Sequence, residues 1–572
     1  MKTVFRYLRP QYARLALQLT IKFIGTITEL FLPWMLSHIL DDIVPQKDMP
    51  QVYLWGVFML LAAAVALLGN VTANRMSTRI SRRFTEQLRH DAFARVAYLS
   101  SRQTDRFTLS SLISRLTSDT YNVHQMVDRM QRLGVRAPIL LLGGICVTFT
   151  LEPVLTLVLI ATLPLLGAVV FTVSRKGVPL YVHVQGAVDS MVRKVQENMT
   201  GVRVIKALSK TEYEKERFDD VNREVVRRDQ HAGAVMATTN PVMSLLLNLG
   251  LTAVVVVGAF RVNAGVSQAG KIIAFLSYFT IILNAMMMVS RLFMLYSKGA
   301  ASAKRIEEIL YTPMEPVPGD PAPRASEYHV EFKHVRFSYN KAEGKTRDDL
   351  SDVSFALKRG QTLGVIGPTG SGKSTIVSLL MRFYDADAGE IRIGGRRIEG
   401  IPEEELHTMF GVVFQNDFIL ADTIRENIDF GRGLPDEALL IAAKHAQADF
   451  IAEKEGGLDH PLTAKGANLS GGQKQRLLIA RALAAKPEIL VLDDCSSALD
   501  YKTDKELRGA LHRNFRETTT IIIAQRISSI LNADHILVLD GGRVTGAGTH
   551  AELLETCADY REIYEAQMGE VG

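Results

Sequence analysis

Four long runs without a charged side chain constrain the fold of this chain more than any other feature. Residues 51–74, 154–174, 232–260 and 272–290 contain no Asp, Glu, Lys, Arg or His, and the runs hold 24, 21, 29 and 19 residues. About 20 apolar residues are enough for a helix to cross ~30 Å of hydrocarbon. The chain is therefore predicted to span a membrane at least four times.

Two weaker runs bring the predicted number of spans to six. Residues 137–151 form a charge-free run of 15 residues, and residues 13–40 are mostly apolar but include Lys22, Glu29 and His38. The shorter run could instead be a buried helix of a soluble domain. An even number is favoured because the chain must return to the side of its C-terminal domain. The predicted membrane helices cover approximately residues 12–40, 51–75, 133–151, 153–175, 238–261 and 270–296.

Charge asymmetry orients these spans. Residues 1–14 carry four basic side chains and no acid, whereas residues 41–50 carry three acids and one Lys. Lys and Arg accumulate on the cytoplasmic side of membrane helices. Both termini and the Arg-rich segment 75–136 are therefore predicted to be cytoplasmic, in a multi-pass protein of the cell (plasma or inner) membrane. The basic N-terminus leads into a long span without a cleavage-site pattern, which argues against a cleaved signal peptide.

Two segments between spans, 75–136 and 175–230, are too long to be simple loops. Apolar residues recur in them near helical spacing among charged ones, as at Phe93, Val96 and Leu99. We expect membrane helices that continue beyond the bilayer, each pair joined by a short transverse helix. Two inserted subdomains are the alternative, but neither segment has a core pattern of its own.

Composition indicates a second, soluble domain after the membrane half. Hydrophobic residues make up 47% of the 572 residues and charged residues 22%, too apolar for a soluble chain and too polar for one that is all membrane. Five of the 19 prolines fall in residues 312–324, a density that ends a helix. We predict a transmembrane domain at 1–310, a linker at 311–327 and a nucleotide-binding domain at 328–566. Three cysteines exclude a disulfide-stapled secreted domain, and a net charge of +5 does not indicate a nucleic-acid partner.

The soluble half has the pattern of an α/β domain with a largely parallel sheet. Short β-branched runs at 362–366, 411–414, 489–492 and 520–523 alternate with helical stretches. The first run leads into a glycine-rich segment of the form G-x-x-x-x-G-K-[ST], which wraps backbone N–H groups around phosphates at a helix start. A chance glycine-rich turn is the alternative. The predicted phosphate-binding residues are Gly367, Thr369, Gly370, Ser371, Gly372, Lys373, Ser374 and Thr375.

A magnesium site accompanies this phosphate loop. The Ser374 hydroxyl is expected to bind Mg²⁺, and the strand 489–492 delivers Asp493 as the metal-holding carboxylate. The alternative reading of Asp493 is a helix-capping residue. ATP with Mg²⁺ is therefore the predicted ligand.

The segment Leu469-Ser470-Gly471-Gly472-Gln473 decides the class, because with it the chain resembles the ATP-binding cassette (ABC) transporter superfamily over nearly its whole length. Six spans followed by one cassette match the exporter-type half-transporters. The resemblance places Tyr339 on the adenine, Gln415 on Mg²⁺ and water, and Ser497-Ala498-Leu499-Asp500 between cassettes. It implies that two cassettes pair head to tail, with ATP between one chain's phosphate loop and the other chain's Ser470–Gln473 segment. Coupling helices would lie near 101–107 and 209–216.

Three positions depart from the family pattern. Asp494 follows Asp493 where the family usually has Glu, and Gln525 stands where it usually has His. Asp retracts its carboxylate by about 1 Å, and a misplacement of that size can cost ~10²-fold in rate. An amide cannot carry the charge of an imidazolium. Ala464 replaces an acid often found before the signature. The phosphate loop and the signature, by contrast, remain intact.

These departures favour one subunit of a heterodimeric exporter of amphipathic or hydrophobic compounds, multidrug or lipid-like. This chain would hold a slow site and lend its signature to the partner's site. The alternatives are a non-hydrolytic regulatory or channel-like protein, an importer and a peptide exporter. Substrate-contacting residues are not identified by the sequence. The candidates within the spans are Glu29, Arg291 and Met286–Met288, each of which could instead serve packing or a salt bridge.

Overall fold

The computed structural model describes residues 1–313, 326–339, 348–415, 418–495 and 499–569. The chain divides into two compact units, and each is described by itself. The first unit consists of Met1–Tyr98 and Thr108–Thr312, and the second of Leu99–Phe107 and Pro313–Gly572. Most of the predicted linker, residues 314–325, lies outside the described residues.

The first unit is entirely helical. Its described part holds six continuous helical stretches long and apolar enough to cross a membrane, which confirms the predicted number. The short runs 39–43, 115–119 and 139–143 are π-helical turns within these stretches. The α-helices are α1 (Lys2–Leu8), α2 (Tyr12–His38), α3 (Met49–Ala97), α5 (Leu109–Ser114), α6 (Thr120–Leu133), α7 (Arg136–Pro138), α8 (Gly144–Leu151), α9 (Pro153–Thr200), α10 (Val202–Ala207), α11 (Thr211–Ala237), α12 (Thr239–Asn263) and α13 (Ala269–Leu310).

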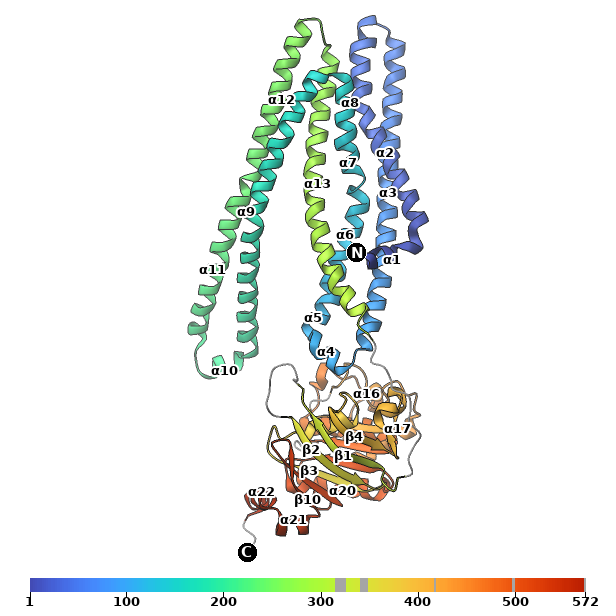
Figure 1. Cartoon of the computed structure of the whole chain (residues 1–572), viewed down its shortest axis with the longest axis vertical. Coiled ribbons are helices and arrows are strands. Elements are labelled where there is room, and N and C mark those ends of the chain that lie inside the picture. Colours follow the sequence, from blue (N-terminus) through green and yellow to red (C-terminus); the bar gives the residue numbers. More distant parts are fainter. Residues whose placement is uncertain (314–325, 340–347, 416–417, 496–498, 570–572) are drawn as a thin grey trace. The chain divides into compact units, whose positions relative to one another are not determined.

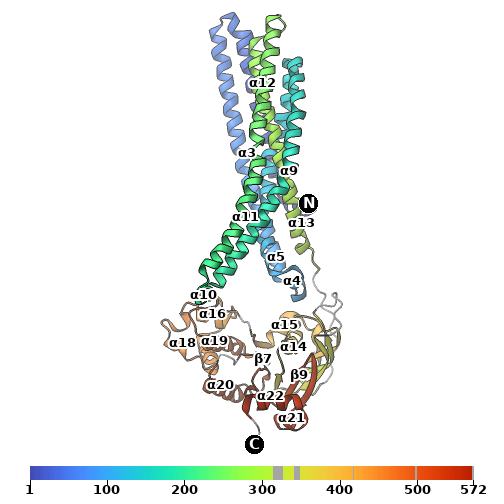
Figure 2. The same cartoon turned by 90° about the vertical axis from the view of Figure 1, so that its left-hand side faces the viewer.

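The helices of the first unit form two groups. Helices α2, α3, α6 and α13 pack together, whereas α9 packs with α11 and α12 (Figures 1 and 2). Helices α2 and α3 approach backbone to backbone, because Gly25 and Gly69 face each other and a Cβ on Gly69 would lie 3.3 Å from the Gly25 Cα. Tyr278 of α13 is fully buried and donates its hydroxyl to the Leu30 carbonyl of α2 at 2.6 Å. The helices also extend past the apolar runs, as expected: α3 continues to Ala97 and α9 to Thr200.

The prediction for the second transverse helix is wrong by about two helical turns. The short helix is α10, at Val202–Ala207, whereas residues 211–216 already belong to the long helix α11. Gly201 ends α9, and Ser209 takes a left-handed conformation with φ 53° between α10 and α11. The chain therefore turns at these two residues. The first transverse helix, α4, has the predicted bounds Ser101–Phe107.

The second unit contains two sheets. A four-stranded antiparallel sheet has the order β2-β1-β4-β5, and a six-stranded sheet has the order β10-β9-β3-β8-β7-β6. In the larger sheet only β10 runs antiparallel to its neighbour, so the predicted α/β fold is confirmed. The strands are β1 (Val330–Phe337), β2 (Leu350–Leu357), β3 (Thr362–Ile366), β4 (Ala388–Ile393), β5 (Arg396–Arg397), β6 (Phe410–Val413), β7 (Ile489–Asp493), β8 (Thr519–Ile523), β9 (His535–Asp540) and β10 (Arg543–Gly548).

Helices enclose these sheets and form a separate helical core. Ile376 and Leu380 of α14 pack against the sheets, while Leu439, Leu477 and Ile479 belong to a second core built from α16, α17 and α19. Within this unit Tyr384 donates its hydroxyl to Asp105 of α4 at 2.5 Å. The helices are α4, α14 (Lys373–Leu380), α15 (Glu403–Thr408), α16 (Ile424–Asp429), α17 (Asp436–His445), α18 (Phe450–Glu453), α19 (Gly471–Ala484), α20 (Tyr501–Asn514), α21 (His550–Thr556) and α22 (Ala558–Met568).

Candidate nucleotide site

The candidate phosphate loop joins the end of β3 to the start of α14. Two of its glycines are needed for steric reasons. At Gly367 a Cβ would lie 2.0 Å from the Leu539 carbonyl oxygen, and Gly372 has φ +97° with the Asp349 carbonyl oxygen 2.9 Å from the Cβ position. A side chain at either place would clash with neighbouring backbone. The sequence therefore folds into a loop whose N–H groups lie next to a helix N-terminus, an arrangement that binds anions.

Two side chains of the loop are able to bind a phosphate group. Lys373 Nζ donates to the carbonyl oxygens of Gly367 and Pro368 at 2.8 Å each. Burial lowers the pKa of Lys373, and the nearby carboxylates of Asp493 and Asp494 oppose that shift. The Ser371 hydroxyl is buried without a hydrogen-bond partner among the described residues. A bound phosphate oxygen would satisfy Ser371 and give Lys373 a charged partner, so the loop fits a nucleotide phosphate.

A cavity of about 300 Å³ lies in front of this loop. It brings together ten of the predicted site residues, drawn from the loop, α14, β7 and the ends of β6 and β8. Its lining also includes Asp349 and Ile523, which the sequence did not single out and which no motif marks. The lining residues are Asp349, Thr369, Gly370, Gly372, Lys373, Ser374, Thr375, Gln415, Asp493, Asp494, Ile523 and Gln525.

Asp493 is the buried carboxylate of the site. It ends β7, lies beside Ile523 of β8 and is 5% exposed. Burial raises the pKa of Asp493, while a hydrogen bond from the Ser374 hydroxyl lowers it. A hydroxyl and a carboxylate in contact, with Gln415 lining the same cavity, supply the oxygen ligands that Mg²⁺ prefers. The residues present therefore fit a magnesium ion.

Asp494 is held by Gln525. Asp494 adopts φ 51°, a left-handed conformation uncommon for a residue other than glycine. Its Oδ2 accepts a hydrogen bond from Gln525 Nε2 at 2.8 Å. Burial raises the pKa of Asp494, and Lys373 and Arg526 oppose the shift. Two of the three residues that depart from the family pattern are thus in direct contact across the ends of β7 and β8.

Other predicted residues lie outside the cavity lining. The Tyr339 ring is 43% exposed, and its hydroxyl lies 3.5 Å from Thr375 Oγ1. Ser470 caps α19, where Ser470 and Gln473 bond to each other's backbone N–H. Gly471 and Gly472 form the first turn of that helix. Ser497 and Ala498 lie outside the described residues. The signature therefore presents its helix start separately from the cavity of the same chain.

The candidate membrane residues have different surroundings. Arg136 Nη2 donates to Glu29 Oε1 at 2.7 Å, so Glu29 takes part in an interhelical ion pair. Arg291 is exposed, and Met286 packs against the core of α9, α12 and α13. Lys22, a further charged residue within the spans, is 2% exposed and donates to Asn70 and Asn74 of α3 at 2.8 and 3.1 Å. No sequence motif marks it.

Both units match families of known proteins. Residues 15–286 match the family described as ABC transporter transmembrane region, and residues 350–497 match the family described as ABC transporter. The ABC transporter ATP-binding protein YfiB of Bacillus subtilis is 34% identical, with 100% of this chain and 99% of the relative covered. The ABC transporter ATP-binding protein exp8 of Streptococcus pneumoniae is 30% identical, with 100% and 97% covered. A solved structure of a bacterial Atm1-family ABC exporter with ATP bound has a TM-score of 0.83 and 25% identity, with 98% and 99% covered.

Proposed function

This chain belongs to the ABC transporter family, and on that premise we propose that it is one half of a heterodimeric exporter with one slow ATP site. The Asp494–Gln525 contact carries the proposal. The proposed cargo is an amphipathic or hydrophobic compound that moves outward across the cell membrane. Both termini and the cassette lie in the cytoplasm.

ATP binding by this chain rests on the loop and its cavity. Lys373 and the Ser371 hydroxyl, which has no hydrogen-bond partner in the described part of the chain, would bind phosphate oxygens. Ser374, Asp493 and Gln415 would hold Mg²⁺, which when bound neutralises charge that develops on the transferred phosphoryl group. Tyr339 would stack on the adenine from the rim. This chain therefore retains the residues that ATP binding requires.

Hydrolysis at the same site would be slow. The attacking water needs a carboxylate at the right distance, and Asp494 is one methylene shorter than Glu. Its Oδ2 is also engaged by the Gln525 amide. An amide at position 525 supplies no positive charge for the γ-phosphate. A homodimer would repeat these features in both sites, whereas a partner with Glu and His would make the second site fast.

The intact signature segment, Leu469–Gln473, supports the proposal that this chain contributes residues to the partner's ATP site. The capping box at Ser470 and Gln473 orders the first turn of α19 without a partner chain. Free backbone N–H groups at a helix start bind anions. In a head-to-tail pair, Ser470 and Gly472 of this chain would face the γ-phosphate bound by the partner's loop.

Exposed apolar side chains on the arm formed by α9, α10 and α11 support the proposal of a partner chain. The tip of this arm exposes Met199, Val204, Leu208 and Tyr213, with exposed fractions of 66%, 61%, 64% and 56%. Such a group of large apolar side chains at one surface is typical of an interaction site. We propose that the partner half-transporter covers it.

Transport and ATPase assays on the purified chain, alone and with its partner, test this proposal. Sealed vesicles holding the pair should accumulate an amphipathic dye only with hydrolysable ATP. Uptake that proceeds equally with a non-hydrolysable analogue would favour the regulatory or channel-like alternative. Dye movement in the opposite direction would favour an importer.

A further inference from the structure

We propose that one face of α3 is a binding surface for the headgroups of anionic phospholipids. The surface consists of Arg75, Arg79, Arg82 and Arg83 and is called the basic stripe here. All four residues are exposed. The inference goes beyond the proposed function, because neither nucleotide nor cargo takes part in it.

The four arginines share one face of one helix. At 3.6 residues per turn they fall within an arc of about 100° and extend over about 12 Å of the axis. The charge-free run of α3 ends at Asn74, so the stripe begins one residue beyond the apolar run. The headgroup layer is roughly 5–8 Å thick on each side of the hydrocarbon. Arg75 and Arg79 therefore fall at its level, and long arginine side chains allow Arg82 and Arg83 to reach back to it.

The same face of α3 is aliphatic within the span. Leu54, Val57, Leu61 and Leu68 lie in the arc of the basic stripe by helical spacing. Their exposed fractions are 52%, 53%, 55% and 65%. Thr72 also lies in this arc, and its hydroxyl donates to the Leu68 carbonyl of the same helix. An exposed helix face with mostly aliphatic side chains suits lipid acyl chains. The change from aliphatic to guanidinium groups on one face follows the change from acyl chains to phosphates in a bilayer.

The charge of the basic stripe is not compensated. No acidic residue occurs between Arg75 and Arg83, and Glu86 is the first acid that follows. In the part of the chain that the structure describes, no carboxylate lies within 4.0 Å of the four guanidinium groups, although ion pairs are frequent elsewhere. On α11, by contrast, Arg217 pairs with Glu214 at 2.9 Å and Arg223 with Asp220 at 2.7 Å.

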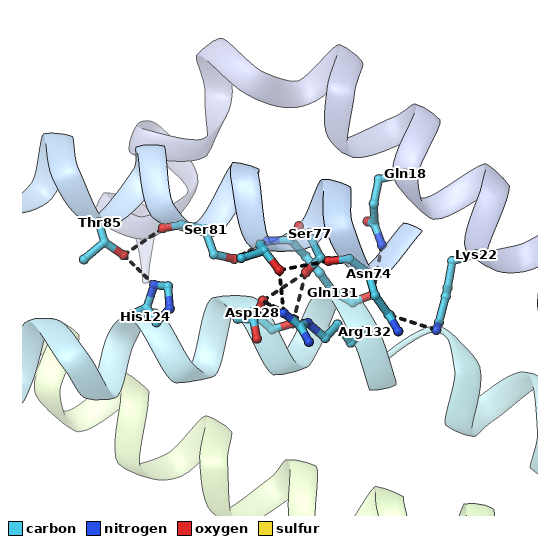
Figure 3. A network of polar contacts seen from close by, with 11 residues as sticks. Gln18, Lys22, Asn74, Ser77, Ser81, Thr85, His124, Asp128, Gln131 and Arg132 are labelled. Carbon is cyan, nitrogen blue, oxygen red and sulfur yellow. Dashed lines mark hydrogen bonds and ion pairs between the residues drawn. The ribbon is translucent and has the colours of Figure 1, made fainter. Parts of the chain in front are cut away.

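The opposite face of α3 fixes the orientation of the stripe. Figure 3 shows this face bonded to α2 and α6. Asn74 accepts from Lys22 at 3.1 Å, and Ser81 Oγ accepts from Gln131 at 3.3 Å. Thr85 and His124 are joined at 2.8 Å. Because these contacts fix one side of α3 against α2 and α6, the arginines on the other side face outward. Lipid binding would therefore not require the helix itself to become ordered.

Phospholipid phosphate fits the stripe better than other anions. Guanidinium groups bind phosphate oxygens in a bidentate manner. Each basic residue close to an anionic membrane surface raises partitioning by about fivefold. The aliphatic face directly next to the stripe would accommodate the acyl chains of the same lipids, which a soluble phosphate lacks.

The test measures lipid selectivity of the full chain reconstituted in phosphatidylcholine vesicles. Spin-labelled phosphatidylglycerol or phosphatidylcholine is added, and the motionally restricted fraction is recorded. The wild-type chain should prefer phosphatidylglycerol by about threefold or more, and roughly 1 M salt should abolish the preference by screening. The variant R75Q/R79Q/R82Q/R83Q should show no preference. The control R217Q/R223Q/R227Q, which removes paired arginines of α11, should behave as wild type.

Two half-variants, R75Q/R79Q and R82Q/R83Q, keep the test decisive if the fourfold variant does not fold. Each should lose part of the preference. An unchanged preference in both half-variants, or an equal loss in the α11 control, would overturn the proposal. Cross-linking of the variant Arg79→Cys to a second half-transporter in the assembled pair would also overturn it, because protein would then cover the stripe.

Discussion

Gln525 donates its side-chain amide to the carboxylate of Asp494 at 2.8 Å. The two side chains come from the ends of adjacent parallel strands, β8 and β7, which pair from Ile489 and Thr519 to Asp493 and Ile523. These two departures from the family pattern therefore form one contact rather than two separate changes. Their effects on catalysis should be coupled.

Restoring both family residues should raise the ATPase rate of the lone chain. Asp494→Glu extends the carboxylate by about 1 Å, and Gln525→His supplies an imidazole, which together should recover up to ~10²-fold in kcat. Each single variant should recover much less, because it leaves the other group mismatched. Steady-state phosphate release from the four proteins of this double-mutant cycle checks the coupling. Strictly additive effects would show that the contact is irrelevant to turnover.

Nucleotide binding should depend on Lys373. Lys373→Ala removes the ammonium group that lies at the loop, so photolabelling of this chain by an azido-ATP should disappear. Ser371→Ala removes one hydroxyl and should weaken labelling only severalfold. The exposed Lys465 serves as a control, and Lys465→Ala should label normally. Undiminished labelling of Lys373→Ala would mean that the nucleotide binds elsewhere.

Cysteine labelling should reveal the topology. Single cysteines at Gln46 and at Val266, which is 62% exposed, should react with an impermeant maleimide added to intact cells. Ser267 is a poor reporter, because it is only 8% exposed. Cysteines at Ser101 and Ser209 should react only after the membrane is opened. Reaction of Ser101 in intact cells contradicts the predicted orientation.

Lys22 should stabilise the α2–α3 pair. Its ammonium group donates to the side-chain oxygens of Asn70 and Asn74, and Lys22→Met would leave these two half-buried acceptors without their donor. Loss of such a partner costs about 1–3 kcal/mol. A lower Tm of the detergent-solubilised chain checks this expectation. Lys47→Met, at an exposed position beyond the end of α2, should leave Tm unchanged, and an equal Tm for both variants would argue against the role of Lys22.

Local patterns in the sequence are sufficient to predict most of the fold. The apolar runs are long enough that their helices are specified by composition, and the phosphate loop is specified by glycines whose Cβ positions are blocked. The position of α10 depends on a left-handed residue, Ser209, for which no glycine signal exists, and the prediction failed there. The Asp494–Gln525 contact depends on strand order, and Asp349 reaches the cavity through tertiary packing. Neither relationship is visible in a linear pattern.

The ATPase rate of the purified chain, alone and paired with its partner, tests the central claim most directly. The lone chain should turn over ATP slowly, and the pair should be at least ~10²-fold faster, because only the partner's site would have a well-placed Glu. In the pair, replacement of the partner's catalytic Glu by Gln should nearly eliminate turnover, whereas Asp494→Asn should reduce it only modestly. Vigorous ATPase activity of the lone chain that Asp494→Asn abolishes would contradict the account.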